Sequence, residues 1–110
     1  MPTKVAAFAA ETAKDKLAAR TIERRDPGPR DVAIEILYCG VCHSDIHAAR
    51  GEWPGVLFPC VPGHEIVGKV TKVGSEVKGF KVGEYAAVGC MVDSCQKCAN
   101  CNAGLEQYCD

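Results

Sequence analysis

The stretch GHEIVGKV, residues 63–70, decides the fold of this 110-residue chain. From Ile66 to Val73 the sequence is mostly β-branched, and its later half alternates apolar and polar side chains as a half-buried strand does. His64 and Glu65 do not fit this pattern, because they place an imidazole and a carboxylate where the strand begins. The sequence therefore predicts a strand over residues 65–73 with a candidate site at its start.

Further short strands are expected on both sides of this one, separated by turns rich in glycine and proline. Their predicted ranges are 4–10, 17–24, 32–39 and 81–88. A short helix is expected over residues 43–50, with Ser44 as its N-cap, and residues 51–63, which hold three prolines, are expected to form a loop. Short strands with such punctuation indicate an all-β sandwich or a partly open barrel.

Composition narrows the class of protein and the partners that it could bind. The chain has the length of about one domain, and its 13 basic and 14 acidic residues give a net charge of -1, which provides no attraction for nucleic acid or an anionic membrane. The N-terminal residues do not form a secretion signal, and no segment is long and apolar enough to span a membrane. We expect a soluble, cytoplasmic protein that binds neither nucleic acid nor membrane.

Eight cysteines are the strongest feature of the composition, and four of them lie close together near residue 110. These four are Cys95, Cys98, Cys101 and Cys109. Residues 90–110 are polar and poor in bulky apolar side chains, so they need a metal rather than a core to order them, and four thiolates form a closed structural zinc site. The alternatives are disulfides, which a reducing compartment disfavours, and an iron–sulfur cluster, which normally has a shorter last gap and a following proline.

A second group of metal-ligating residues lies at two expected strand ends. Cys42 follows the strand predicted to end at Cys39, and His64 precedes the strand over 65–73. If the two ends meet, a soft thiolate and an imidazole face one cation, a combination that zinc prefers. A third ligand must then come from elsewhere, and a catalytic zinc keeps a further position open for water or substrate. The alternative is that His64 is a core histidine with no metal.

The motifs GVCHSD (40–45) and PGHEIVGKV (62–70), followed by the four-cysteine segment, resemble the medium-chain zinc-dependent alcohol dehydrogenases. The stretches YCGVCHSD, EWPGVLFPCVPGHE and GCMVDSC most resemble the cinnamyl-alcohol-dehydrogenase-like, NADP-dependent aldehyde reductase branch, and the likeness runs from Val5 to Asp110. It implies the mainly β, GroES-like, partly open barrel of the family's N-terminal catalytic domain, with a zinc lobe over 90–110. It also implies interconversion of small alcohols and aldehydes by hydride transfer with NADP or NAD.

The resemblance assigns roles to individual residues. Cys42 and His64 match ligands of the catalytic zinc, and the four clustered cysteines match the ligands of the structural zinc. Ser44 matches the hydroxyl that relays the alcohol proton, Asp45 matches a carboxylate that orients the zinc histidine, and Glu65 matches a carboxylate near the metal. Capping by Ser44 and a helix-terminal charge at Asp45 are compatible with these roles.

Three further positions match less specific roles in the family. His47 resembles a further member of the proton relay, His43 a group directed toward the cofactor phosphates, and Trp53 an aromatic wall of the substrate pocket. The alternatives are that His43 and His47 are solvated residues on one helix face and that Trp53 only packs. The remaining cysteines matched to no ligand are expected to be small buried hydrophobes, and these are Cys39, Cys60 and Cys90.

The chain also departs from the family pattern. Glu84 stands where relatives carry an aspartate, which puts the local hydrogen bonding of that strand in doubt. No G-x-G-x-x-G motif is present, so a nucleotide-binding domain is absent, and residues 1–110 are expected to be an incomplete N-terminal domain that is inactive alone. The family's remaining catalytic cysteine is missing too, and Cys39 or Cys60 is a candidate replacement. A non-catalytic zinc-binding module is the alternative function, and the resemblance allows a homo-oligomer for a full-length protein.

Overall fold

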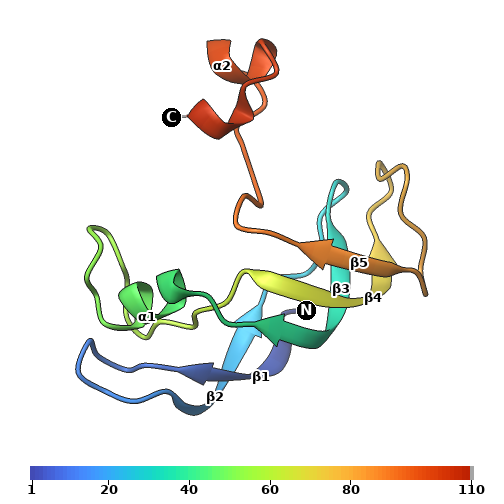
Figure 1. Ribbon diagram of the computed structural model, residues 1–110. Helices are drawn as coiled ribbons and strands as arrows, with labels where there is room; N and C mark the ends of the chain where they lie inside the picture. The colour runs from blue at the N-terminus through green and yellow to red at the C-terminus, as the bar shows by residue number, and fades with distance from the viewer. Residues whose placement is uncertain (110) are drawn as a thin grey trace.

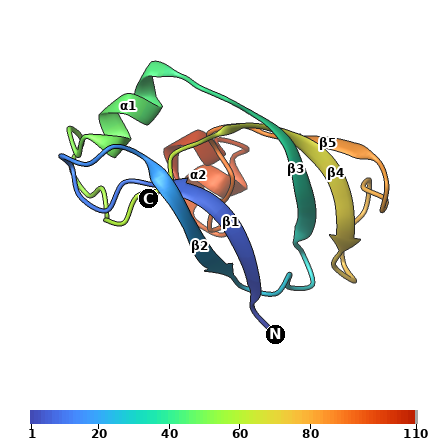
Figure 2. The same cartoon turned by 90° about the horizontal axis from the view of Figure 1, so that it is seen from below.

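The computed structural model describes residues 1–109 and contains two antiparallel sheets (Figure 1). The elements, in chain order, are β1 (Thr3–Ala9), β2 (Ala18–Arg24), β3 (Val32–Gly40), α1 (His43–Ala49), β4 (Glu65–Val73), β5 (Tyr85–Val88), α2 (Ala99–Asn102) and the 3-10 helix η1 (Glu106–Tyr108). One sheet has the order β1-β2 and the other β3-β4-β5. Figure 2 shows the two sheets facing each other as an open arrangement, so the predicted mainly β, partly open barrel is confirmed.

The strand predicted from the opening stretch, β4, is the central strand of the larger sheet. It pairs with β3 on one side and with β5 on the other, and Val70 in its middle is only 2 % exposed. Gly68 is required where β4 pairs with β3, because a Cβ there would lie 2.1 Å from the carbonyl oxygen of Glu35. The strand with the mostly β-branched sequence is therefore the central strand, which pairs with both of the other strands in its sheet.

Three expected strands differ from the structure by one residue at one or both ends, the strand over 65–73 agrees, and one strand differs more. The strand expected over 81–88 starts at Tyr85, because Gly83 adopts a φ of +91° in a turn. Glu84 accepts a hydrogen bond from the Lys81 backbone N–H at 3.1 Å, so the glutamate that departs from the family pattern still bonds to the backbone. The expected strand was too long because the strand-like sequence pattern continues into the turn. The positive φ of Gly83, which the pattern does not show, keeps the strand from starting there.

The cysteine-rich segment forms α2 and η1, two short helical turns that no periodic pattern predicts. Figure 1 shows them standing apart from both sheets, joined to β5 by one extended segment. The lobe was expected to run to residue 110, which lies outside the described residues. Within residues 1–109, no helix has the length and apolar character needed to cross a membrane.

The core of the domain is small for the length of the chain. Its buried apolar residues are Ala9, Ala10 and Val70, while Tyr38 and Leu57 are 74 % and 83 % exposed. The accessible surface is 8468 Å², against roughly 5,900 Å² for a compact protein of this 11.7 kDa mass. The expectation that Cys39 and Cys90 are buried is wrong, because both lie on surface that this thin core leaves open.

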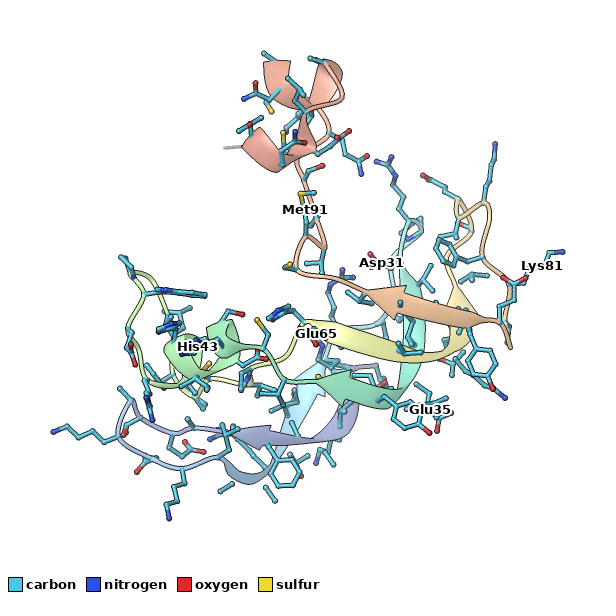
Figure 3. The ribbon with its side chains drawn as sticks, viewed as in Figure 1. Asp31, Glu35, His43, Glu65, Lys81 and Met91 are labelled. Atoms are coloured by element: carbon cyan, nitrogen blue, oxygen red, sulfur yellow. The ribbon has the colours of Figure 1, made fainter. Side chains whose placement is uncertain are left out.

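The turn before β3 is fixed by the carboxylate of Asp31, which Figure 3 labels. Asp31 accepts a hydrogen bond from the Gly28 N–H at 2.8 Å and forms an ion pair with Arg25. Arg25 and then the Gly28 N–H lower the pKa of Asp31 to about 2. The Asp31 carbonyl accepts from the N–H of Gly74 at 2.8 Å, so this turn also holds the end of β4.

Replacing Asp31 by asparagine should destabilise the domain at neutral pH but not in acid. The folded-state pKa lies below the ordinary value of 3.8, so the stabilisation is present above about pH 4 and is lost as the pH falls toward 2. Urea unfolding followed by circular dichroism should give a lower midpoint for Asp31→Asn than for the wild type at pH 7 and equal midpoints near pH 2. Asp15→Asn, at an exposed carboxylate in the turn between β1 and β2, is the matched control. An unchanged midpoint at pH 7 would contradict the prediction.

Candidate metal centres

The antiparallel pairing of β3 and β4 places the end of β3 beside the start of β4. This brings together Cys42, His64 and Glu65. The last residue of β3, Gly40, pairs with the first residue of β4, Glu65. Figure 3 shows Glu65 at this edge, beside α1. The Cys42 sulfur, one ring nitrogen of His64 and one carboxylate oxygen of Glu65 all lie within 4.8 Å of one another. The pairing thus brings two residues predicted as ligands together with a carboxylate expected near the metal.

Cys42 is the N-cap of α1, so the prediction that Ser44 caps this helix is wrong. The Cys42 sulfur accepts from the Ser44 N–H at 3.4 Å, and the Asp45 carboxylate accepts from the Cys42 N–H at 3.0 Å. The Ser44 hydroxyl instead lies 3.2 Å from the Cys42 sulfur and 3.4 Å from His64 Nε2. The Cys-x-x-Asp spacing has the form of a capping box, a signal that the sequence contains.

Asp45 fixes the orientation of His64. Its Oδ1 lies 3.3 Å from His64 Nδ1, and the residue is only 8 % exposed. A proton on Nδ1 directed at this carboxylate leaves the lone pair of Nε2 for another partner, and Nε2 is the nitrogen beside the Ser44 hydroxyl. A carboxylate behind the ring is the usual support of a metal-binding histidine.

The ionisation of Cys42 and His64 is also perturbed toward the charged forms. Hydrogen bonds from the Ser44 hydroxyl and then from its backbone N–H lower the pKa of Cys42. The hydrogen bond with Cys42 raises the pKa of His64, and the charge of Asp45 adds to this effect. A thiolate is the form of cysteine that binds a metal, so the surroundings of Cys42 favour a ligand.

The sulfur, nitrogen and oxygen donors are of the kinds that zinc binds, and the side chains must move closer together before they can share one ion. In a tetrahedral zinc site the ligand atoms would lie roughly 3.3–3.8 Å apart, so separations up to 4.8 Å need to shorten by up to about 1.5 Å. Within residues 1–109, neither Cys39 nor Cys60 joins this group, and the third donor is the Glu65 carboxylate.

His43, His47 and Trp53 form a stack of rings at α1 and the loop after it. The centroids of His43 and His47 lie 4.6 Å apart, and those of His47 and Trp53 lie 5.5 Å apart. Glu52, which no sequence signal marks, lies 2.9 Å from His47 Nδ1. Among the described residues, no hydrogen bond or ring contact joins this stack to the Cys42 and His64 side chains.

The four clustered cysteines form a second candidate centre. Their sulfurs all lie within 4.8 Å of one another, and those of Cys95 and Cys101 are 3.9 Å apart. Tetrahedral zinc with bonds of about 2.3 Å would place sulfurs about 3.8 Å apart. Backbone N–H groups point at the sulfurs: Cys95 accepts from Lys97 and Cys98 at 3.5 and 3.2 Å.

The thiols of this lobe have widely separated pKa values. The N–H groups of Lys97 and Cys98 lower the pKa of Cys95 to about 6. The Cys95 N–H acts to lower the pKa of Cys109, but the Cys95 side chain, desolvation and Cys101 together raise it to about 12. Like charges that share one site resist full ionisation unless a cation joins them, and this crowding fits a metal site.

Comparison with known families identifies the fold. Residues 28–110 match the alcohol dehydrogenase GroES-like domain. The chain belongs to this family. It thus carries the GroES-like domain that the sequence motifs led us to expect, with four neighbouring cysteines in its lobe.

Similar proteins with this domain are oxidoreductases. Aldehyde reductase YahK of Escherichia coli is 56% identical over 107 residues, which are 97% of this chain and 31% of the relative. The NADP-dependent alcohol dehydrogenase C of Mycobacterium tuberculosis is 56% identical over 105 residues, 96% of this chain and 30% of the relative. The crystal structure of CAD from Helicobacter pylori complexed with NADP(H) has a TM-score of 0.92 and 44% identity, covering 99% of this chain and 31% of that one. The GroES-like chain therefore spans about a third of the length of these relatives.

Replacing Cys101 by serine should abolish tight zinc binding by the lobe. Changes beside a metal ligand alone weaken binding by roughly 10–100-fold, so loss of a ligand should exceed that range. The measurement is zinc per chain after exchange into chelator, combined with limited proteolysis of the segment that follows β5. Cys90→Ser, at a cysteine outside the four-sulfur cluster, is the control and should retain zinc. Equal zinc content and protease resistance in the two variants would contradict the assignment.

Proposed function

We propose that this chain is the zinc-binding N-terminal part of an NADP-dependent alcohol dehydrogenase or aldehyde reductase. The observation that carries the proposal is the meeting of Cys42, His64 and Glu65 beside the Ser44 hydroxyl. A thiolate, an imidazole and a carboxylate form a zinc ligand set, and an adjacent hydroxyl is the group needed to exchange a proton with a bound alcohol.

In this proposal Cys42, His64 and Glu65 hold the catalytic zinc, which when bound acts as a Lewis acid that polarises the alcohol or aldehyde oxygen. The Ser44 hydroxyl lies 3.2 Å from the Cys42 sulfur and 3.4 Å from His64 Nε2, where it would relay the proton that an alcohol releases by passing its own proton to a further acceptor. Asp45 keeps the His64 ring in the orientation that leaves Nε2 for the metal. Together these residues place a proton acceptor and an electrophilic centre at one edge of the sheet.

The ring stack supplies the next part of the proposed site. His47, held by Glu52 at 2.9 Å, is proposed as the acceptor that follows Ser44. Trp53, stacked on His47, is proposed as a wall of the pocket for the substrate, a small alcohol or aldehyde. His43, at the first turn of α1, is proposed to face the phosphates of NADP. The four cysteines of the lobe hold a structural zinc with no open position.

The rest of the catalytic machinery is proposed to lie in a further part of the polypeptide, as it would in relatives about three times as long. The surface of residues 1–109 supports this, because it exceeds that of a compact protein by a wide margin and includes Tyr38, Leu57 and Tyr85 at 70 % exposure or more. A radius of gyration of 15.5 Å, against about 13 Å for a compact chain of this length, supports it too. In this proposal residues 1–110 form one part of a domain that further chain completes.

The isolated 110-residue chain, loaded with zinc, should not oxidise NADPH when an aromatic aldehyde is added. Hydride transfer requires a nicotinamide held against the reacting carbon, and the described residues contain two antiparallel sheets with no nucleotide-binding βαβ unit. Absorbance of NADPH over time checks this, with E. coli YahK as the positive control. Turnover that depends on Cys42 would show that the chain is active alone.

A chimera in which residues 1–110 replace the matching segment of the M. tuberculosis enzyme should be active. In this chimera, Ser44→Ala should lower kcat by roughly 100-fold or more. The reason is that a positioned proton acceptor contributes about 10²–10⁴-fold. Alcohol oxidation with NADP, with zinc content measured in parallel, separates loss of the proton acceptor from loss of the metal.

Ser75→Ala, in the turn after β4, is the matched control in this chimera and should leave kcat unchanged. An unaltered kcat in Ser44→Ala would contradict the role of that hydroxyl. A folded chimera with two zinc ions per subunit and no activity would favour the other function class, a non-catalytic zinc-binding module.

A further inference from the structure

Gly40, the last residue of β3, lies directly across from Glu65 at the edge that holds the candidate catalytic centre. Its backbone does not adopt the left-handed conformation that requires glycine, since the positive-φ glycines of residues 1–109 do not include it. The reason for a glycine here is space. A Cβ on residue 40 would lie 2.3 Å from Glu65 Oε2 and 3.1 Å from the Glu65 Cβ.

The atoms that crowd Gly40 differ from those that crowd the other tightly packed glycines of the sheet. A Cβ on Gly68 would meet the carbonyl oxygen of Glu35, and one on Gly74 would meet the carbonyl of Pro29. Those contacts involve backbone and would disturb the sheet. The three atoms nearest to a Cβ at position 40 all belong to the Glu65 side chain, and the nearest is its flexible end. An alanine at position 40 therefore displaces the carboxylate most, and the Glu65 Cβ at 3.1 Å requires the strands to give by only a few tenths of an ångström.

We propose that Gly40 is a positioning residue, whose missing side chain allows the Glu65 carboxylate to reach the cation held by Cys42 and His64. The inference rests on the proposed function, because it assumes that these residues bind a metal. Glu65 is exposed, and its carboxylate lies over Gly40 and near His64, whose charge attracts it. The space that a side chain on residue 40 would fill is thus left for the Glu65 carboxylate.

The displacement caused by a methyl group is large compared with the tolerance of a metal site. Non-bonded carbon and oxygen atoms need at least about 3.0–3.4 Å, so Oε2 must move by roughly 0.7 Å or more from its 2.3 Å separation. Ligand distances in metal sites vary by only about 0.2 Å. These donors must already close by up to about 1.5 Å to share one ion, and with Gly40→Ala the methyl group occupies space that the carboxylate needs.

Cobalt(II) binding to the 110-residue chain tests the inference, because the absorption of cobalt reports its coordination without requiring catalysis. The variants are Gly40→Ala, Glu65→Gln and the double variant. Gly89→Ala is the matched control, since Gly89 has no neighbouring atom within 4 Å of a Cβ and no positive φ. Chelator competition measures the affinity of the ion held outside the four-cysteine lobe, and circular dichroism checks the sheets.

We expect Gly40→Ala and Glu65→Gln each to lower the affinity for this ion by roughly 10–100-fold, with the same change in its absorption. The double variant should be no weaker than Glu65→Gln alone, because both changes remove the same carboxylate. Gly89→Ala should bind like the wild type.

Three results would overturn the inference, and they are distinguishable. If the wild type holds cobalt only in the lobe, the proposed catalytic centre and the role of Gly40 both fail. If the wild type holds a second ion and Gly40→Ala holds it equally tightly, or if the two changes are additive, only the role of Gly40 fails. If Gly40→Ala also loses the lobe ion or the strand signal, the glycine serves the fold and not the carboxylate.

Discussion

The antiparallel pairing of β3 with β4 is the interaction on which the larger sheet and the candidate catalytic centre both depend. A shift of one residue in a strand moves every side chain to the opposite face. The register has two irregularities, between Ala33 and Ile34 and between Ile36 and Tyr38, yet Gly40 still pairs with Glu65 at the end. The backbone hydrogen bonds between the two strands thus set the positions of the candidate ligands Cys42, His64 and Glu65.

The sequence was most informative where a local pattern and the fold agree. The β-branched stretch after Glu65 predicts β4 to the residue, and the cysteine spacing predicts a cluster whose sulfurs converge. It was least informative where space decides the outcome. No local pattern shows that Glu65 lies over a residue without a side chain, whereas the cap at Cys42 has a signal in the Cys-x-x-Asp spacing. Cys39 and Cys90 appeared suited to burial because a completed core was assumed, whereas the sheets leave them exposed.

The two candidate metal centres are assembled on different scales. The lobe closes over a short stretch, with Cys95 and Cys109 separated by 14 positions, and most of its hydrogen bonds to sulfur come from its own backbone. In the other centre, Ser44 and His64 are separated by 20 positions and meet only when the sheet has formed. Closing a longer loop costs more entropy, and here the sheet supplies the compensating interactions. The first centre is therefore local to the cysteine segment, and the second depends on the strands.

The extended segment after β5, which is the one covalent link between the sheets and the cysteine lobe, has a consequence for metal supply (Figure 1). A unit joined by one such segment exchanges its metal as an independent equilibrium, because few contacts transmit the change to its neighbour. If both centres hold zinc as proposed, this weak coupling lets them empty at different free zinc concentrations. Under the proposed function, the cysteine segment would then be the first part of the chain that proteases reach, while the strands stay paired.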